Sequence, residues 1–360
     1  MTWFSPCVWG DVDGYTGIRS FYHGSAIGRA ITNAFWTILG NDVVTLNKYD
    51  SHPETKKLKP WSQAMFTASS FSILNYPTDI FDLVRDGTVK VHIADVTGLS
   101  ARTVHLSDGT QLDTDALCCV TGWKHVPPVK FLPEGIDKEL GLPHAPSEGD
   151  DLFTPKAVAK ADDEILSRFP RLKDQPIQNK NMKPLLATKG LSTTDQLNPS
   201  TDLTPWTLYH FIAPPSPRLL QTRDIAFAGV LMNFTTFMVA HAQSVWIHAY
   251  FSDALPATTL PRLHPNPTTT ASSDKTKTLD EVRYETVLHA RFGKWRYPAG
   301  HGTQFPDFVF DALPYVDLLV NDLGLKVHRK EGWFAEATEP YGPADYRDLV
   351  GEFAARTRTD

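Results

Sequence analysis

The amino-acid sequence predicts an α/β protein that ends in a helical cap, and three features support this prediction. The segment Asp113–Trp123, DTDALCCVTGW, places small and β-branched residues between an acidic turn and a Thr-Gly pair. That pattern is typical of a buried strand whose end lets another group approach the backbone. Residues 224–251 join a second apolar run to a long amphipathic stretch, and residues 279–360 have the pattern of a small helical cap.

Composition and charge limit the classes of partner. The 360 residues are 41% hydrophobic and 21% charged, which is ordinary for a globular chain long enough to form two domains. The net charge of −6 argues against a nucleic acid or an anionic membrane as partner. The first residues lack a signal-peptide pattern, and the most apolar segment, Ile225–Ala240, is too short to span a bilayer. Three cysteines cannot build a disulfide framework, so we expect Cys118 and Cys119 to be packing residues of a reduced, cytoplasmic protein.

The first part of the chain predicts two helices and three consecutive strands. Ser25–Leu39 and Asp79–Arg85 have helical spacing, and the second ends at an Asp-Gly pair. Val89–Ile93, Thr103–Leu106 and Ala116–Val120 are rich in β-branched or small apolar residues, and an Asp-Gly turn signal follows the second of them. The apolar side of the first helix comprises Ile27, Ala30, Ile31, Ala34, Phe35 and Ile38.

The remaining elements follow a region rich in proline, lysine and aspartate. Within that region Pro155–Phe169 predicts one helix. Asp224–Val230 predicts a buried strand that ends at an Ala-Gly pair, and Thr235–Phe251 predicts the helix after it. Pro256–Thr278 has the composition of a linker, and Leu279–Phe292 predicts a further helix. The buried face of the helix after the strand comprises Phe237, Met238, Ala242, Val245, Trp246, Ala249 and Tyr250.

Residue spacing disfavours a hydrolase site and a metal site. The string Gly24-Ser25-Ala26-Ile27-Gly28 resembles a nucleophile elbow, but its serine follows the first glycine directly and no strand precedes it. Ser25 is therefore expected to cap a helix. The 13 histidines are scattered without HExxH spacing, so no metal site is predicted.

No glycine-rich nucleotide loop is found in the sequence. A dinucleotide site normally has a Gly-x-Gly-x-x-Gly turn between a strand and a helix, whose first amides hold the pyrophosphate. Gly24 and Gly28 fall on an expected helix, and Gly10, Gly14 and Gly17 follow an aromatic segment that contains proline. The sequence therefore predicts no independent pyrophosphate-binding loop.

Long strings of residues nevertheless resemble a known family. They are SPCVWGDVDGYTGIRSFYHGSAIGRA, LNKYDSHPETKKLKPW, SSFSILNY and ALCCVTGW, followed by DIAFAGVLMNF, AHAQSVWIHAY, PDFVFDALPYVDLLVNDLGL and RKEGW. In this order they resemble the C-terminal portion of fungal flavin-containing monooxygenase-like proteins, which are class B flavoprotein monooxygenases. The implied fold is an incomplete two-dinucleotide-binding-domain flavoprotein fold with a helical C-terminal cap.

The resemblance also implies a division into five segments. Residues 1–130 would be a remnant of the nicotinamide and flavin core with interdomain strands, and residues 131–205 would be an insertion. Residues 206–255 would supply the closing strand and helix of the flavin domain. A linker over residues 256–278 and a helical cap over residues 279–360 would follow.

Four positions carry over as cofactor-binding residues and one as a cavity residue. Thr121 and Gly122 match the element where the chain crosses between the two nucleotide domains. Gly229 matches the end of the last flavin-domain strand, where its backbone would face the flavin, and Gln243 lies on the helix packed beneath it. Asn75 matches a polar position on the substrate cavity. The resemblance identifies no catalytic residue.

The implied activity is an oxygenation of a small organic substrate that depends on FAD and NADPH, in fungal secondary metabolism. NADPH would reduce the flavin, and the reduced flavin would activate dioxygen and transfer one oxygen atom. Because the glycine-rich loops are absent, three explanations stay open. The chain could be a truncated monooxygenase, a flavin-less non-redox enzyme such as a cyclase or isomerase, or a non-catalytic partner of a full-length paralogue. An incomplete fold would also expose apolar surface and favour homo-oligomers.

Overall fold

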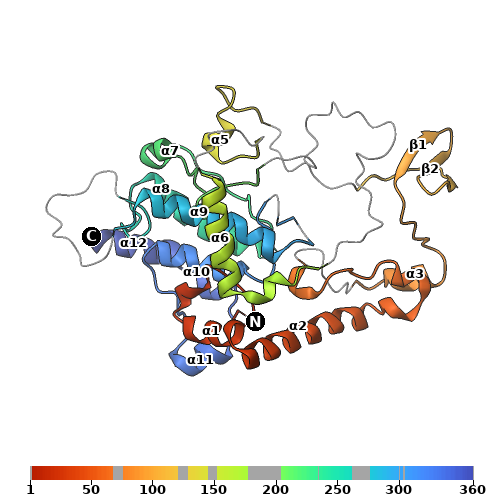
Figure 1. Ribbon diagram of the computed structural model, residues 1–360, viewed down its shortest axis with the longest axis horizontal. Coiled ribbons are helices and arrows are strands. Elements are labelled where there is room, and N and C mark those ends of the chain that lie inside the picture. Colours follow the sequence, from red (N-terminus) through yellow and green to blue (C-terminus); the bar gives the residue numbers. More distant parts are fainter. Residues whose placement is uncertain are drawn as a thin grey trace.

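Helices dominate the computed structural model, which describes residues 2–67, 76–120, 129–144, 152–176, 204–233, 235–261, 276–299, 301–302 and 305–359 (Figure 1). The helices are α1 (Thr16–Gly24), α2 (Ala26–Leu46), α3 (Pro53–Lys56), α4 (Ile80–Arg85), α5 (Asp137–Leu140), α6 (Pro155–Arg168), α7 (Pro217–Thr222), α8 (Thr236–Phe251), α9 (Leu279–Arg296), α10 (Ala312–Asp322), α11 (Gly332–Thr338) and α12 (Leu349–Thr359). The strands are β1 (Val96–Ser100), β2 (Thr103–Leu106) and β3 (Gln111–Asp113).

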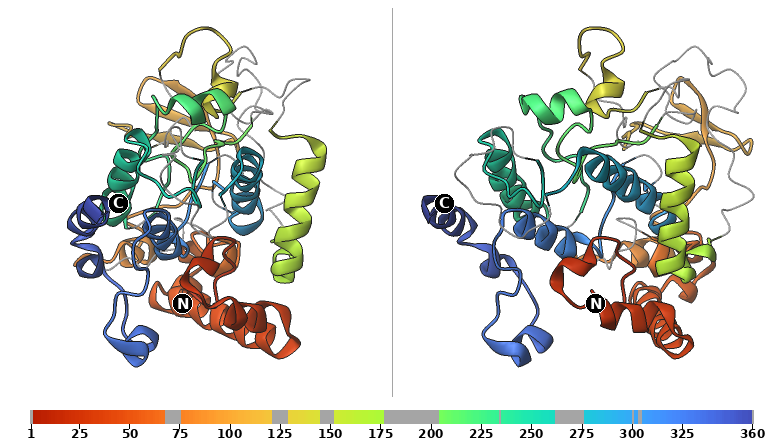
Figure 2. Two further views of the ribbon diagram at one scale, coloured as in Figure 1. Left: turned by 90° about the vertical axis from the view of Figure 1, so that its left-hand side faces the viewer. Right: turned by 60° about the vertical axis from the view of Figure 1, so that its left-hand side comes forward.

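The core lies between the helices of the second half of the chain and the N-terminal segment. Helix α6 packs on α9, and α8 packs on α10. Trp9 from the N-terminal segment enters this core, where its ring contacts Phe211, Phe292 and Phe308 at centroid distances of 5.8, 5.1 and 4.7 Å. The two views of Figure 2 show α1 and α2 along one side of the helical body, next to one end of α6. Residues from both ends of the sequence therefore share one core.

Helix α2 begins where the sequence predicts and runs further. Ser25 caps it by accepting a hydrogen bond from the Gly28 N–H at 2.9 Å, which confirms the expected cap. Its buried face is Gly28, Thr32, Trp36 and Val43, so the apolar side seen in the sequence is not the buried face of the helix. Of that predicted side, Ile27, Ile31 and Ile38 are 69%, 42% and 61% exposed.

The orientation of α2 follows from Trp36. The Trp36 indole N–H donates to the Phe4 carbonyl at 2.8 Å, and its ring contacts Phe310 at 4.9 Å. The Arg296 guanidinium lies over the same ring at 5.1 Å. These contacts place the Trp36 side of the helix against the core, because a large aromatic ring gains more from burial and ring contacts than the smaller isoleucines do.

The sheet is a small antiparallel meander in the order β1-β2-β3. Thr103–Leu106 forms the predicted strand, and Asp108-Gly109 makes the predicted turn with Gly109 at φ 89°. Val89–Ile93 and Ala116–Val120 are not strands, which corrects two predictions. Figure 1 shows the sheet beyond α3, away from the helical body.

Exposure explains why Ala116–Val120 does not form a strand. All five residues are exposed, with Val120 at 91%, and Cys118 and Cys119 are exposed free thiols rather than packing residues. β-branched residues favour strands only where neighbouring strands and a packed face are present. The described part of the chain offers this segment neither.

Four predicted helices are confirmed as α4, α6, α8 and α9. Helix α9 extends past Phe292 to Arg296 and begins with a capping box between Thr278 and Glu281. On α8 the predicted buried face is correct except at Phe237, which is 94% exposed.

Asp224–Val230 is not the predicted buried strand. The segment is neither helix nor strand, and its residues are exposed or half-buried. The Phe227 N–H of this segment donates to the Ile212 carbonyl at 2.9 Å. The nearby Met232 and Asp307 form an isolated parallel bridge. The structure is thus a mixture of helix with a small sheet. No parallel sheet occurs in the described ranges, so the two-dinucleotide-binding arrangement and its division into segments stay predictions.

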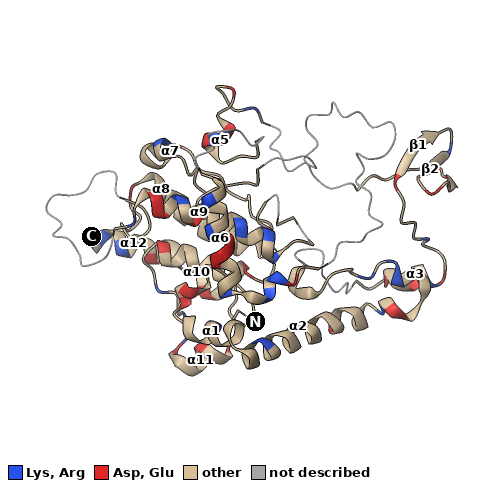
Figure 3. Cartoon of the chain, in the orientation of Figure 1, with Lys and Arg blue, Asp and Glu red and all other residues tan. Residues whose placement is uncertain are grey.

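The helical body carries charged residues of both signs, and none of its described helices is apolar over a long stretch. Figure 3 shows acidic and basic residues interspersed over the helical body. Among the described residues, no helix combines the length and the apolar character that a bilayer crossing requires.

Candidate functional site

Gly229 forms an exposed turn shortly before α8. Its φ of 75° lies in the left-handed region that favours glycine. No atom lies within 4 Å of the position that a Cβ would occupy, so one side of the backbone is open. The Gly229 N–H donates to Oε1 of Gln243 at 3.1 Å. The Gln243 side chain therefore fixes this turn by a hydrogen bond, and the side of the backbone where a Cβ would lie is open.

Gln243 connects this turn to the core. The side chain is 1% exposed, and its Nε2 donates to the Tyr315 hydroxyl of α10 at 2.9 Å. The Tyr315 hydroxyl donates in turn to the His210 carbonyl at 2.7 Å. Two residues named by the resemblance, Gly229 and Gln243, thus contact each other and connect by hydrogen bonds to a residue that the sequence did not single out.

His210 has an unusual backbone conformation. His210 and the next residue, Phe211, have φ of 48° and 60°. This left-handed conformation costs roughly 1–2 kcal/mol per residue with a side chain. The tertiary structure holds it through the Tyr315 hydrogen bond and through the bridge between Tyr209 and Ala213. Such strain commonly marks a functional position.

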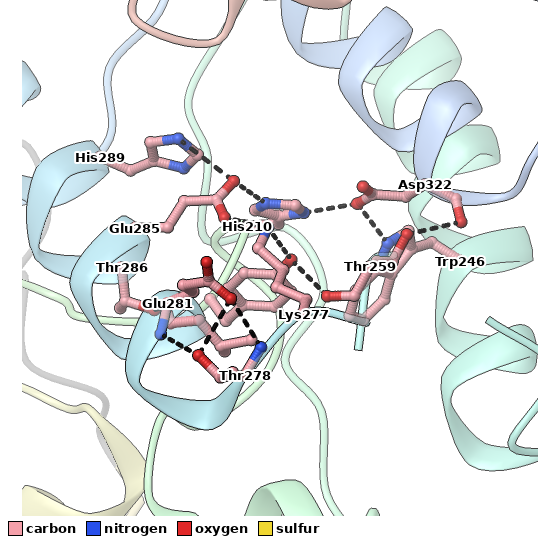
Figure 4. A network of polar contacts seen from close by, with 12 residues as sticks. His210, Trp246, Thr259, Lys277, Thr278, Glu281, Glu285, Thr286, His289 and Asp322 are labelled. Carbon is pink, nitrogen blue, oxygen red and sulfur yellow. Dashed lines mark hydrogen bonds and ion pairs between the residues drawn. The ribbon is translucent and has the colours of Figure 1, made fainter. Parts of the chain in front are cut away.

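The His210 side chain lies between two carboxylates (Figure 4). Its Nδ1 lies 2.5 Å from Oδ2 of Asp322, and its Nε2 lies 2.9 Å from Oε1 of Glu285. Asp322 also accepts from the Trp246 indole N–H at 2.8 Å, and Oε2 of Glu285 pairs with the Lys277 ammonium. The result is a chain of alternating charge from Asp322 through His210 and Glu285 to Lys277.

Burial and the neighbouring charges set the protonation of these groups. Burial lowers the pKa of His210, but the Asp322 carboxylate and the hydrogen bonds to Asp322 and Glu285 outweigh it and raise that pKa to about 9. Burial raises the pKa of Glu285, but the His210 hydrogen bond and charge hold it well below its usual range. Without another ligand, His210 is therefore a cation between two carboxylates.

His289 is the third titratable group of the cluster. It is 3% exposed, and burial lowers its pKa to about 3, so the imidazole is neutral. Its Nε2 lies 3.8 Å from Oε1 of Glu285, and its Nδ1 has no hydrogen-bond partner among the described residues. Its ring packs on Trp9 and His210 at centroid distances of 5.0 and 5.5 Å.

A cavity of about 430 Å³ adjoins this cluster. Lys277, Glu285 and His289 contribute polar atoms to its wall, and Trp9 and Leu288 contribute apolar surface. The cavity can accept a small molecule beside these charged groups. A mostly apolar wall with a few polar groups is the usual composition of a ligand pocket.

Three of the predicted site residues cannot be placed. Thr121, Gly122 and Asn75 lie outside the described residues. Trp246, on the same helix as Gln243, is fully buried and stacks on Tyr250 at 5.4 Å.

Sequence reasoning missed His210, Glu285 and His289. One signal was present, because Glu285 and His289 are four residues apart on a predicted helix and so share a face. His210 gave no signal, because it lies 75 residues before Glu285 and only the tertiary structure brings the two together.

Curated relatives of this chain are fungal proteins. The FAD-dependent monooxygenase rstn6 of Aspergillus nomiae is 29% identical over 89% of this chain and 50% of its own length. The FAD-dependent monooxygenase resA of Aspergillus sclerotiorum is 31% identical over 85% of this chain and 48% of its own length. The FAD-dependent monooxygenase DEP4 of Alternaria brassicicola is 25% identical over 97% of this chain and 54% of its own length.

No family model matches the sequence, and no solved structure matches it either. The chain spans about half the length of the curated relatives that it matches. The similarity covers most of the chain and agrees with the resemblance seen in its motifs. Over most of its length the chain is therefore similar to part of fungal proteins named FAD-dependent monooxygenases.

Proposed function

We propose that this chain forms part of an FAD-dependent monooxygenase that oxygenates a small organic substrate in fungal secondary metabolism. The observation that carries the proposal is the match to relatives named FAD-dependent monooxygenases at 25–31% identity over most of the chain. The open Gly229 turn, held by Gln243, supports it from the geometry.

The described residues fit one edge of a flavin site. A flat ring can approach the Gly229 backbone because no side chain covers it. Gln243 would keep that turn in place, and Thr121 and Gly122 are proposed as further contacts. The same residues do not fit a pyrophosphate site, since no strand–glycine–helix unit occurs among them. The chain would therefore contact the ring and leave the pyrophosphate to other residues.

The bound flavin would supply the oxygen-transfer chemistry, with NADPH proposed as its reductant. The protein's own contribution would be to shape a water-excluding pocket and orient the substrate in it. Asn75 is proposed as a polar residue of that pocket.

Flavin binding by the purified chain tests the proposal. We expect flavin absorbance in the purified protein, or binding of added FAD seen as a change in flavin fluorescence. Replacing Gln243 with Leu should weaken binding because the Gly229 turn loses its hydrogen bond, and Ser244→Ala, on the exposed side of the same helix, should not. A colourless chain that leaves added FAD free would contradict the proposal for this chain.

The exposed isoleucines of α2 favour a second candidate, a non-catalytic partner of a full-length paralogue. An apolar helix face of this kind is typical of a protein–protein interface. Co-purification with a larger flavoprotein, lost when Ile31 and Ile38 are both replaced by Glu, would support this candidate. Retention of the partner by that double variant would count against it.

A further inference from the structure

We propose that His210, Glu285 and His289 bind one divalent transition-metal ion, and that Zn²⁺ suits this ligand set best. Two imidazole nitrogens and one carboxylate oxygen are common zinc ligands. This inference is independent of flavin binding and of the proposed activity.

The three ligand atoms converge on one point. Oε1 of Glu285 faces Nε2 of His210 at 2.9 Å and Nε2 of His289 at 3.8 Å, and the three ligand atoms all lie within 4.8 Å of one another. Ligands about 2.0–2.1 Å from a tetrahedral zinc ion lie roughly 3.3 Å apart. The two separations from Oε1 of Glu285, 2.9 and 3.8 Å, bracket that value, and the two imidazole nitrogens lie no more than 4.8 Å apart.

The surrounding groups orient two of the ligands. Asp322 holds Nδ1 of His210, which leaves Nε2 directed at Glu285. Lys277 holds Oε2 of Glu285, which leaves Oε1 directed at the two imidazoles. A carboxylate on the second nitrogen of a ligating histidine is the usual outer partner at zinc sites. The ammonium of Lys277 thus contacts the oxygen that the metal would not use.

His289 supplies an independent observation. The His289 residue is only 3% exposed, yet its Nδ1 has no hydrogen-bond partner among the described residues. Its Nε2 lies 3.8 Å from Oε1 of Glu285. A buried polar group without a hydrogen bond is destabilising. A metal ion on Nε2 would bond the nitrogen that faces Oε1 of Glu285, and Nδ1 would then carry the ring proton.

The site also has room for a further ligand. Glu285 and His289 line the 430 Å³ cavity, with Lys277 beside them. Three protein ligands with one open position is the pattern of zinc sites that also bind water or a substrate atom. Figure 4 shows the cluster, with His210 between Glu285 and Asp322.

The competing arrangement has a proton in place of the metal. His210 would then donate to both Asp322 and Glu285, and the cluster would be an ion chain with Lys277 at its end. Metal analysis separates the two, because only the metal site retains a transition ion.

The test uses the full chain, freed of any affinity tag, stripped with EDTA and dialysed against ZnCl₂ and then against metal-free buffer. We expect about one zinc per chain by elemental analysis. CoCl₂ should give the visible absorption of a tetrahedral site. Glu285→Gln and His289→Asn should each weaken Zn²⁺ binding by roughly tenfold or more, and so should Asp322→Asn through loss of the outer partner. His248→Asn, which alters an exposed histidine of α8, is the matched control and should bind like wild type.

Two results would overturn the proposal. One is a wild-type chain that retains no zinc and shows no cobalt spectrum. The other is a folded Glu285→Gln chain that binds as much zinc as the His248→Asn control. Because the first result needs no variant, the proposal stays testable even if a substitution in the buried cluster prevents folding.

Discussion

At the scale of single residues, Gln243 connects more of the structure than Gly229 does, and these are the two residues named by the resemblance that lie within the described ranges. It connects the exposed Gly229 turn to the buried Tyr315 hydroxyl, and through it to the His210 carbonyl. One amide side chain thus satisfies a backbone donor on one side and contacts a phenol on the other. A substitution of Gln243 should therefore both destabilise the protein and loosen the Gly229 turn.

We expect Gln243→Leu to lower the free energy of unfolding by about 1–3 kcal/mol, because a buried hydroxyl and the Gly229 N–H lose their partner. Urea denaturation followed by circular dichroism measures this change. Ser244→Ala, one residue away on the exposed side of α8, should change stability by no more than about 0.5 kcal/mol. Equal effects of the two substitutions would contradict this role of Gln243.

Asp317 of α10 is a buried carboxyl group with a raised pKa. Its Oδ1 accepts a hydrogen bond from the Tyr346 hydroxyl at 2.6 Å. Burial raises the pKa of its carboxyl to about 7, and neither this hydrogen bond nor Arg329 fully offsets the effect. The folded chain therefore holds a proton on Asp317 at a pH where the unfolded chain has released it.

Because the folded pKa is the higher one, the free energy of unfolding should fall as pH rises from about 4 to about 7. Asp317→Asn keeps an acceptor for Tyr346 and removes the titration. We expect the variant to lose this part of the pH dependence, measured by urea denaturation at several pH values between those limits. An unchanged slope in the variant would show that Asp317 does not titrate there.

At the scale of elements, the crossing of α1 and α2 depends on a glycine. A Cβ on Gly28 would collide with the Phe21 carbonyl and the Tyr22 backbone of α1. At Gly40, on the same helix, a Cβ would meet only Ala64 among the described residues, with the Ala64 Cβ at 3.6 Å and its backbone N at 4.0 Å. The two glycines therefore differ in packing although both are helical.

We expect opposite effects from the same substitution at these two positions. Gly28→Ala should destabilise the protein by about 1–3 kcal/mol, because the two helices must separate. Gly40→Ala should stabilise it by about 0.5–1 kcal/mol through helix propensity. Thermal unfolding of the two variants measures the difference, and a lower melting temperature for Gly40→Ala than for Gly28→Ala would refute the argument.

At the scale of the whole molecule, apolar surface lies outside the core. Ile27, Ile31 and Ile38 form an exposed stripe on α2. A contiguous apolar face is uncommon on a monomeric soluble protein and favours association. The sequence analysis expected exposed apolar surface from an incomplete fold, but it did not place that surface on this stripe.

The purified chain should therefore self-associate as its concentration rises and bind the dye ANS. Replacing Ile31 and Ile38 with Glu should lower both effects, measured by light scattering after size exclusion and by ANS fluorescence. Thr37→Glu, an exposed polar position on the same helix, is the control for added charge. A wild-type chain that is monomeric at all concentrations and binds no ANS would exclude an association role for this face.

Local signals in the sequence determined five of the described helices, α2, α4, α6, α8 and α9. Ser25, Thr154 and Thr278 each accept a hydrogen bond at the start of a helix, and the apolar spacing behind them fixed α2, α6 and α9. A helix satisfies its own backbone within a few residues, so these signals need no distant partner. The family, too, could be inferred from strings of residues alone, and the comparisons agree with it.

Only the tertiary structure decided the strands, the buried faces and the cluster. Ala116–Val120 has strand-forming residues but no described partner strand, and α2 turns Trp36 rather than its isoleucines toward the core. His210 meets Glu285 and His289 across a long sequence separation. Strand pairing, burial and side-chain clusters all depend on partners distant in the chain, and such partners leave no periodic trace in the sequence.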